Sequence, residues 1–159
     1  MEAAREIILR RLSLRAHSRA ELEKALRDRD VDASVGAELL DRFSELDLVD
    51  DEAFAEQWVS SRHRTKGLSR RALAEQLRRK GIAHEVIADA TQAIDQPAEM
   101  AAAEDVARKK LRSMASVTDP VVIRRRLAGA LARRGYSSEV VHAVVGRIVQ
   151  GAGEDQESS

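Results

Sequence analysis

The chain has 159 residues, of which 43% are apolar and 3% aromatic, and its 27 basic side chains balance 27 acidic ones. This apolar content argues against disorder throughout, and abundant Ala, Leu, Arg and Glu favour helices over strands. Cysteine is absent, which excludes disulfides and thiolate metal sites and is typical of a reducing compartment. With no apolar run long enough to span a bilayer and no signal peptide after Met1, a soluble cytoplasmic protein is expected.

One short pattern occurs three times along the chain. A leucine near the end of an apolar helix is followed by basic residues, a break and a large apolar residue, at residues 26–31, 77–82 and 131–136. The three leucines are 51 and 54 residues apart, and a period of this size indicates tandem repeats. Repeat arrays usually present an extended surface to a large partner and seldom enclose a catalytic pocket.

Residues 1–49 are predicted to form a first repeat of three helices. Ser18 and Glu21 have the spacing of a capping box at the start of the second helix. Asp30 stands where the later repeats have glycine, and aspartate tolerates the left-handed region less well, so a looser or differently capped helix end is expected. The apolar positions at helical spacing are Ile7, Ile8, Leu12, Leu22, Ala25, Leu26, Val35, Leu39 and Phe43.

Residues 50–96 are predicted to form the second repeat. Asp50 or Asp51 can cap its first helix, which Gly67 interrupts, and Ser69 can cap the second helix. Gly81 supplies the left-handed conformation that ends the second helix, and Pro97 closes the repeat. The apolar positions are Phe54, Ala55, Trp58, Val59, Leu73, Leu77, Ile82, Ile87, Ala90 and Ile94.

Residues 97–150 are predicted to form the third repeat, and residues 151–159 a disordered tail. Asp119 and Pro120 are a typical helix start, and Ser137 or Ser138 can begin the last helix. The apolar positions are Ala103, Ala107, Leu111, Ile123, Leu127, Leu131, Val141, Val144, Val145 and Ile148. The predicted fold is therefore all-α, with three tandem three-helix repeats forming an elongated, curved array of nine helices.

The residues offer little for catalysis. The four histidines, His17, His63, His84 and His142, are far apart in sequence, and no metal-ligand spacing or nucleotide-binding loop is present. The acidic pairs 50–51 and 104–105 stand where helix starts are expected, so capping explains them. We therefore expect a protein that is not an enzyme and that needs neither a cofactor nor a metal.

Charge is distributed in bands. Residues 62–80 hold eight Lys or Arg residues and one acid, whereas residues 28–56 hold eleven acids and two arginines, and residues 85–105 hold six acids and no Lys or Arg. Bands of this kind can be a solvated surface, or they can steer a charged partner. Phe54 and Trp58 could stack bases, but both fall on the apolar stripe of their helix, which favours a core position.

Basic side chains that recur at equivalent repeat positions are the candidates for partner binding. A solvated helix face is the alternative for each of them, but arginine suits bidentate contacts to carboxylate or phosphate. The candidate partner-binding residues are Arg62, Arg64, Lys66, Arg70, Arg71, Arg78, Arg79, Lys80, Arg124, Arg125, Arg126, Arg133 and Arg134.

Three passages resemble the bacterial RecX regulatory proteins, which modulate the RecA recombinase. They are LRAHSRAEL at residues 14–22, LVDDEAFAEQW at residues 48–58 with Arg62 and LRRKGI at residues 77–82, and LARRGY at residues 131–136 with Val140. The resemblance covers about residues 5–149. It implies an all-helical protein of three tandem three-helix units without a cofactor or enzymatic activity.

The resemblance also implies a mechanism: binding to RecA, lodging along the groove of the RecA–DNA filament, and limiting filament growth, ATP hydrolysis and strand exchange. The family provides no catalytic residues to transfer, so the candidate residues rest on charge alone. A DNA-binding module acting through phosphate contacts without RecA is one alternative, and a helical scaffold for another partner is a second. We expect a monomer with no membrane association and at most weak direct contact with DNA.

Overall fold

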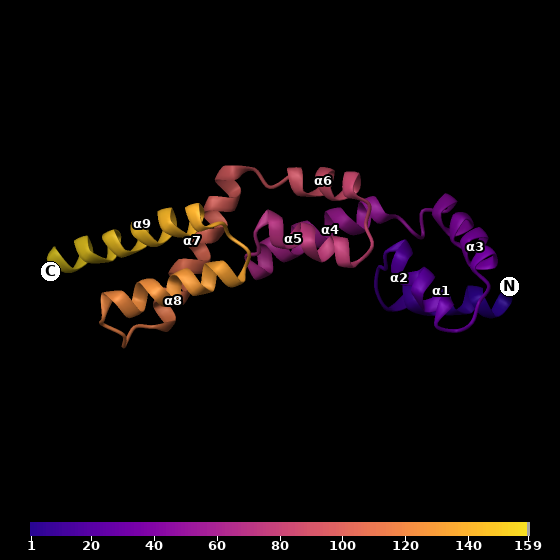
Figure 1. Cartoon of the computed structure of the whole chain (residues 1–159), viewed down its shortest axis with the longest axis horizontal. Coiled ribbons are helices and arrows are strands. Elements are labelled where there is room, and N and C mark those ends of the chain that lie inside the picture. Colours follow the sequence, from indigo (N-terminus) through magenta and orange to yellow (C-terminus); the bar gives the residue numbers. More distant parts are fainter. Residues whose placement is uncertain (159) are drawn as a thin grey trace. The chain divides into compact units, whose positions relative to one another are not determined.

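The computed structural model describes residues 1–158, and within them the chain folds into nine helices and no strands (Figure 1). The helices are α1 (Glu2–Leu14), α2 (Arg19–Arg27), α3 (Ala33–Glu45), α4 (Asp51–Lys66), α5 (Arg70–Arg79), α6 (His84–Gln92), α7 (Gln96–Ser113), α8 (Pro120–Arg133) and α9 (Ser138–Glu157). The all-α prediction is therefore confirmed for this part of the chain. Among these helices, none combines the length and the apolar character that crossing a bilayer requires.

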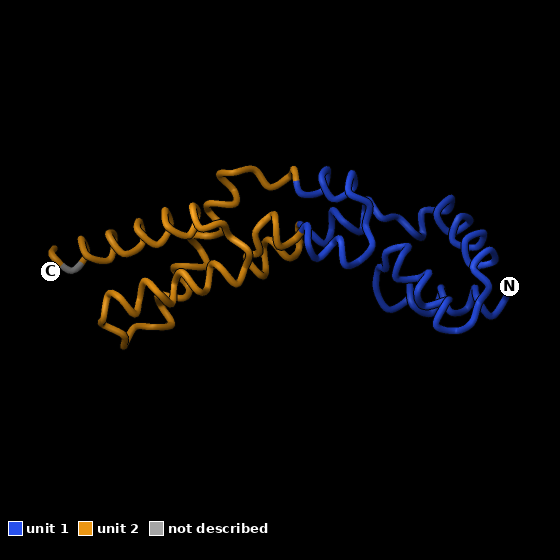
Figure 2. Tube along the Cα trace, viewed as in Figure 1, with its two compact units in different colours: residues 1–59, 74–91 blue, residues 60–73, 92–159 orange. Residues whose placement is uncertain are grey.

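The helices form two compact units, which Figure 2 colours separately. Unit 1 comprises residues 1–59 and 74–91, and unit 2 comprises residues 60–73 and 92–159. The boundary between the units passes through α4 and through α5. The middle repeat therefore supplies residues to both units.

Each unit has its own apolar core. In unit 1, the core of the first repeat consists of Ala4, Ile8, Leu22, Leu26, Leu39, Leu40, Phe43 and Val49. In unit 2, the core of the third repeat consists of Ala103, Ala107, Met114, Leu127, Leu131, Tyr136, Val144, Val145 and Ile148. Most of these residues lie at helical spacing on the buried face of their helix, as the periodicity predicted, whereas Val49, Met114 and Tyr136 lie between helices.

Except at residues 104–105, the predicted helix starts are confirmed, and the structure decides between two pairs of alternatives. Ser18 accepts a hydrogen bond from the Glu21 backbone N–H, while the Glu21 carboxylate accepts one from the Ser18 N–H, which completes the capping box. Asp50, rather than Asp51, accepts from the backbone N–H of the third residue after it. Ser137, rather than Ser138, caps α9. These caps satisfy N–H groups that the helices themselves leave without acceptors.

All three copies of the repeated pattern end their helix in the same way. Gly81 and Gly135 have φ values of 75° and 87°, and Asp30 has a φ of 57°. The N–H of Val31 donates to Leu26 O at 3.1 Å, which matches the bond from Ile82 to Leu77 O at 3.1 Å. The expectation of a looser or differently capped end at Asp30 was wrong, because the backbone forms the same bonds with aspartate in the left-handed conformation.

Three further details differ from the predictions. Residues 151–157 continue α9 rather than forming a disordered tail, and Ser159 lies outside the described residues. Glu104 and Asp105 lie within α7 rather than at its start, and Glu104 pairs with Arg147 at 2.5 Å. Pro97 stands in the first turn of α7, which Asp95 caps, so the helix begins just before the proline.

Candidate partner-binding surface

Helices α5 and α8 each combine buried leucines with exposed arginines. Leu73 and Leu77 of α5 are fully buried, as are Leu127 and Leu131 of α8. Residues three or four apart share one helix face, and most of the arginines stand at other spacings from these leucines, so they face solvent. The candidate residues that the structure leaves exposed are Arg64, Lys66, Arg70, Arg71, Arg78, Arg79, Arg124, Arg125, Arg126 and Arg133.

The other candidates, Arg62, Lys80 and Arg134, are half-buried. Lys80 and Arg134 occupy equivalent positions in the second and third repeats, directly before the helix-ending glycines. Each contacts the repeat that precedes its own. Their place in these junctions sets them apart from the exposed arginines.

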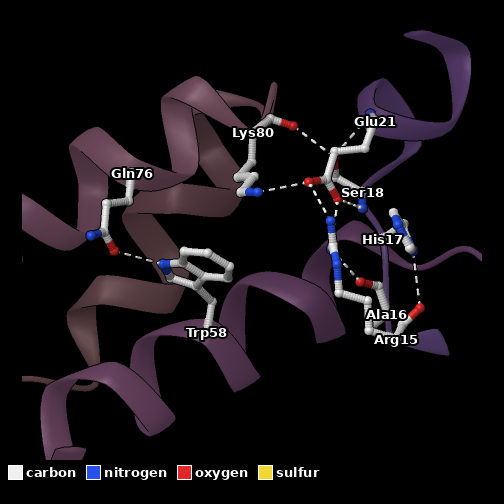
Figure 3. Close-up of polar contacts among 8 residues, drawn as sticks. All are labelled: Arg15, Ala16, His17, Ser18, Glu21, Trp58, Gln76 and Lys80. Atoms are coloured by element: carbon white, nitrogen blue, oxygen red, sulfur yellow. Dashed lines mark hydrogen bonds and ion pairs between the residues drawn. The ribbon is translucent and has the colours of Figure 1, made fainter. Parts of the chain in front are cut away.

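The junction between the first two repeats lies within unit 1 (Figure 3). The buried Ser18 hydroxyl donates to Lys80 O at 2.6 Å, and Lys80 Nζ lies 2.7 Å from Glu21 Oε1. Arg15 donates to the same carboxylate at 3.2 Å. A Cβ added at Gly81 would collide with the Cβ of Ala20. The N-terminus of α2 thus packs against the glycine that ends α5.

The equivalent junction between the second and third repeats lies within unit 2. The Ser69 N–H donates to Arg134 O at 3.0 Å, and a Cβ added at Gly135 would lie 2.6 Å from the Ser69 hydroxyl oxygen. The Tyr136 hydroxyl donates to Gly67 O at 2.7 Å, and burial raises the pKa of Tyr136 to about 12. A serine N-cap that meets a helix-ending glycine is therefore the shared docking element of both junctions.

Trp58 belongs to the packing of unit 1. Its ring stacks with Phe54 at a centroid distance of 5.7 Å, and its Nε1–H donates to Gln76 Oε1 at 2.9 Å. Lys80 Nζ lies 5.2 Å from the centroid of the same ring, within the range of a cation–π contact (Figure 3). Phe54 is buried and Trp58 is half-buried, which supports the core position over a base-stacking role.

Unit 2 contains a basic groove of about 650 Å³ that the sequence did not reveal. Small residues such as Gly67, Ala101 and Ala102 line part of it. Its basic side chains are His63, Arg64 and Lys66 at the end of α4, Lys109 and Lys110 on α7, and Arg134 after α8, with Asp105 as the one acid. A groove of this kind can hold phosphate or carboxylate groups.

Lys109 and Lys110 were not among the predicted partner-binding residues. Residues 108–112 include four basic side chains, but this run does not recur at the positions of the basic second helices. Lys109 and Lys110 come close to Arg64 and Lys66 only through packing of two helices that are more than 40 residues apart in the sequence. Only the folded structure brings these groups together.

The ionisation of Glu21 provides a test of the junction in unit 1. Burial would raise the pKa of Glu21, but hydrogen bonds from Arg15, Lys80 and the Ser18 N–H lower it from 4.5 to about 2. The stabilisation is therefore complete above about pH 4.5 and is lost as the pH falls towards 2. We expect Glu21→Gln to lower the free energy of unfolding by about 2 kcal/mol at pH 7 and to have little effect near pH 2.

Urea unfolding at a series of pH values checks this expectation. Glu23→Gln is the matched control, because Glu23 forms an exposed pair with Arg19 within one helix, and such pairs contribute little. A Glu21→Gln effect that stays constant between pH 7 and pH 2 would show that the carboxylate charge does not stabilise the junction.

Taken together, the described chain is a helical-repeat protein whose second helices expose arginine and whose repeats meet through serine–glycine junctions. Comparison with known proteins places it within one family of this class. Models of the first, second and third three-helix domains of RecX match residues 4–43, 50–90 and 98–145. The chain belongs to the RecX family.

Relatives and solved structures agree with this assignment. The chain is 47% identical over 147 residues to Regulatory protein RecX of Mycolicibacterium smegmatis, a match covering 91% of this chain and 78% of that protein. It is 42% identical over 157 residues to Regulatory protein RecX of Streptomyces coelicolor, covering 99% and 83%. A crystal structure of RecX from Lactobacillus salivarius shares the fold with a TM-score of 0.78 at 20% identity, covering 92% of this chain and 94% of that one.

Proposed function

We propose that the chain is a non-enzymatic cytoplasmic regulator that binds RecA as a monomer, lodges on the RecA–DNA filament and limits filament growth, ATP hydrolysis and strand exchange. The observation that carries the proposal is the match of all three RecX domains in tandem. The relatives bear the name of a regulatory protein, which agrees with a role exerted through binding.

The exposed arginines of α5 and α8 are the proposed contact surface. The members of this set are Arg70, Arg71, Arg78, Arg79, Arg124, Arg125, Arg126 and Arg133. Their guanidinium groups can pair bidentately with carboxylates on RecA or with phosphates of the filament's DNA. Because these arginines are exposed and the buried leucines of the same helices form the packing, the arginines can bind a partner without rearranging the fold.

The proposal is tested by the rate of ATP hydrolysis as RecA filaments form on single-stranded DNA. Increasing concentrations of the protein are expected to lower the rate in a saturable manner. An unchanged rate with the protein in excess over RecA would reject the proposed function. Retention of the protein on RecA filaments in a pull-down separates weak inhibition from absence of binding.

The basic groove of unit 2 favours a second candidate, direct binding to DNA phosphates without RecA. In that case the affinity for single-stranded DNA alone is high and falls steeply as salt rises. Lys109→Glu is expected to weaken this binding about tenfold, because it places a negative charge in the groove. Arg112→Glu changes the charge of the same helix equally but lies outside the groove lining, so it serves as the control. Weak DNA binding with intact inhibition of RecA rejects this candidate.

A further inference from the structure

The first helices of the first and third repeats present the same surface. Ala4 and Ile8 of α1 are buried in their core as Ala103 and Ala107 of α7 are in theirs, which aligns the two helices. When Ala4 is aligned with Ala103, five further positions of the two helices correspond. They are Ala3, Glu6, Ile7, Arg10 and Arg11 in α1, and Ala102, Asp105, Val106, Lys109 and Lys110 in α7. Both sets line a groove, with the same order of small, acidic, apolar and basic residues.

In unit 2 this surface receives the preceding repeat. The turn after α4 lies against Val106, so that a Cβ added at Gly67 would be 2.5 Å from Val106 Cγ2. Arg134 donates from Nε to Lys66 O at 3.3 Å, which binds one of the carbonyls left free at the end of α4. The α7 surface is thus a receptor for the C-terminal turn of a helix.

In unit 1 no other repeat of the described chain covers the equivalent surface of α1. It is an open groove of about 890 Å³ lined by α1 residues together with Arg15, His17 and Arg29. Arg29 is the counterpart of Arg134 in the repeat pattern. Leu14 at the groove is 80% exposed, and Ile7 remains partly exposed. The α1 groove thus has counterparts of the Arg134 donor, the apolar Val106 and the basic residues of the α7 surface. No other repeat of the described chain occupies it.

The charge of the groove identifies the occupant. Its rim carries Arg10, Arg11 and Arg29 and one acid, Glu6, although the chain as a whole has no net charge. A fourth arginine of the rim, Arg15, already pairs with Glu21. A helix C-terminus with acidic side chains complements such a rim, because its free carbonyls carry partial negative charge. In both internal junctions the N-terminus of a second helix packs closely against a glycine, Gly81 or Gly135. A second copy that docked in the same way would meet the Cβ of Asp30 instead, which argues against a second copy as the occupant.

We propose that the α1 groove binds the C-terminal turn of an acidic amphipathic helix of a partner protein. Leu14 and Ile7 pack against its apolar residues, and Arg10, Arg11 and Arg29 bind its carboxylates and terminal carbonyls. This surface is separate from the arginines of α5 and α8, so it adds a second contact to the proposed function and does not require that function to be correct.

The probe is an N-acetylated peptide of about four helical turns, made of Leu, Ala and Glu with Leu at every third or fourth position. Titration followed by amide chemical shifts is expected to show saturable binding, with shifts concentrated in residues 3–17 and at Arg29. Leu14→Glu is expected to raise the Kd about tenfold, because it replaces an apolar contact with a repelling charge. The matched control is Val121→Glu on α8, where the replaced side chain is 69% exposed.

Several results would overturn the proposal. One is the absence of saturation at millimolar peptide, and another is equal binding by wild type and Leu14→Glu. If a peptide with Lys in place of Glu binds equally well, the proposed charge complementarity is contradicted. A dimer of the protein alone that Leu14→Glu abolishes would assign the groove to a second copy, and shifts in the same residues with a single-stranded oligonucleotide would assign it to nucleic acid.

Discussion

Replacing Gly81 by valine is expected to lower the free energy of unfolding by about 4 kcal/mol. Two costs contribute. A β-branched residue at a φ of 75° carries about 1–3 kcal/mol of backbone strain. Its Cβ also collides with Ala20 in the junction between the first two repeats, and overpacking of this kind costs about 1–3 kcal/mol more. Urea or thermal unfolding followed by circular dichroism measures the combined loss.

Asp30→Val is the matched control, since it separates the two costs. Asp30 has a φ of 57° and forms the same helix-ending bonds, but its side chain is exposed. Valine there is expected to carry the backbone strain alone, a loss of about 1–2 kcal/mol relative to aspartate. If the two variants lose equal stability, the close approach at Gly81 does not matter and the docking element is misassigned.

Replacing Arg70, Arg71, Arg78 and Arg79 by alanine is expected to weaken inhibition of RecA-dependent ATP hydrolysis at least about tenfold, at unchanged thermal stability. Each exposed arginine removed from a charged interface costs a fraction of a kcal/mol to several kcal/mol, and four together exceed the 1.4 kcal/mol that corresponds to a tenfold change. Stability is expected to hold because alanine has the higher helix propensity and the buried leucines of α5 are untouched.

A control variant changes the net charge by the same amount elsewhere. Arg5, Lys24, Arg27 and Arg112 are exposed and lie outside α5 and α8, so their replacement by alanine tests for a general charge effect. Equal loss of inhibition by both variants would point to non-specific electrostatics. Full inhibition by the α5 variant, with its fold intact, would remove α5 from the proposed contact surface.

The sequence predicted the local features well because each depends on a few neighbouring residues. Ser18 with Glu21, Asp119 with Pro120, and Gly81 before Ile82 specify helix starts and ends through contacts within one turn. Asp30 was the exception among these sites. The pattern of backbone bonds that ends the helix outweighs the modest preference of aspartate against the left-handed region.

The surface was less predictable because it depends on contacts between repeats. Lys80 and Arg134 look in sequence like the neighbouring arginines, yet their place before a glycine puts them in the junctions. Lys109 and Arg64 line the same groove only because α7 packs beside the end of α4. Charge and periodicity identify which residues face outwards from their own helix, but they carry no information about which neighbouring repeat covers that face.

The division of α4 and α5 between the two compact units has a consequence for how the chain unfolds. Each unit draws part of its packing from the same two helices, so the loss of either unit removes contacts from a helix that the other also needs. Repeat proteins with strong coupling between neighbours lose their structure together, whereas weakly coupled repeats come apart one at a time. The sharing of α4 and α5 therefore favours a single cooperative transition over three successive ones, and the calorimetric and van't Hoff enthalpies of unfolding should agree.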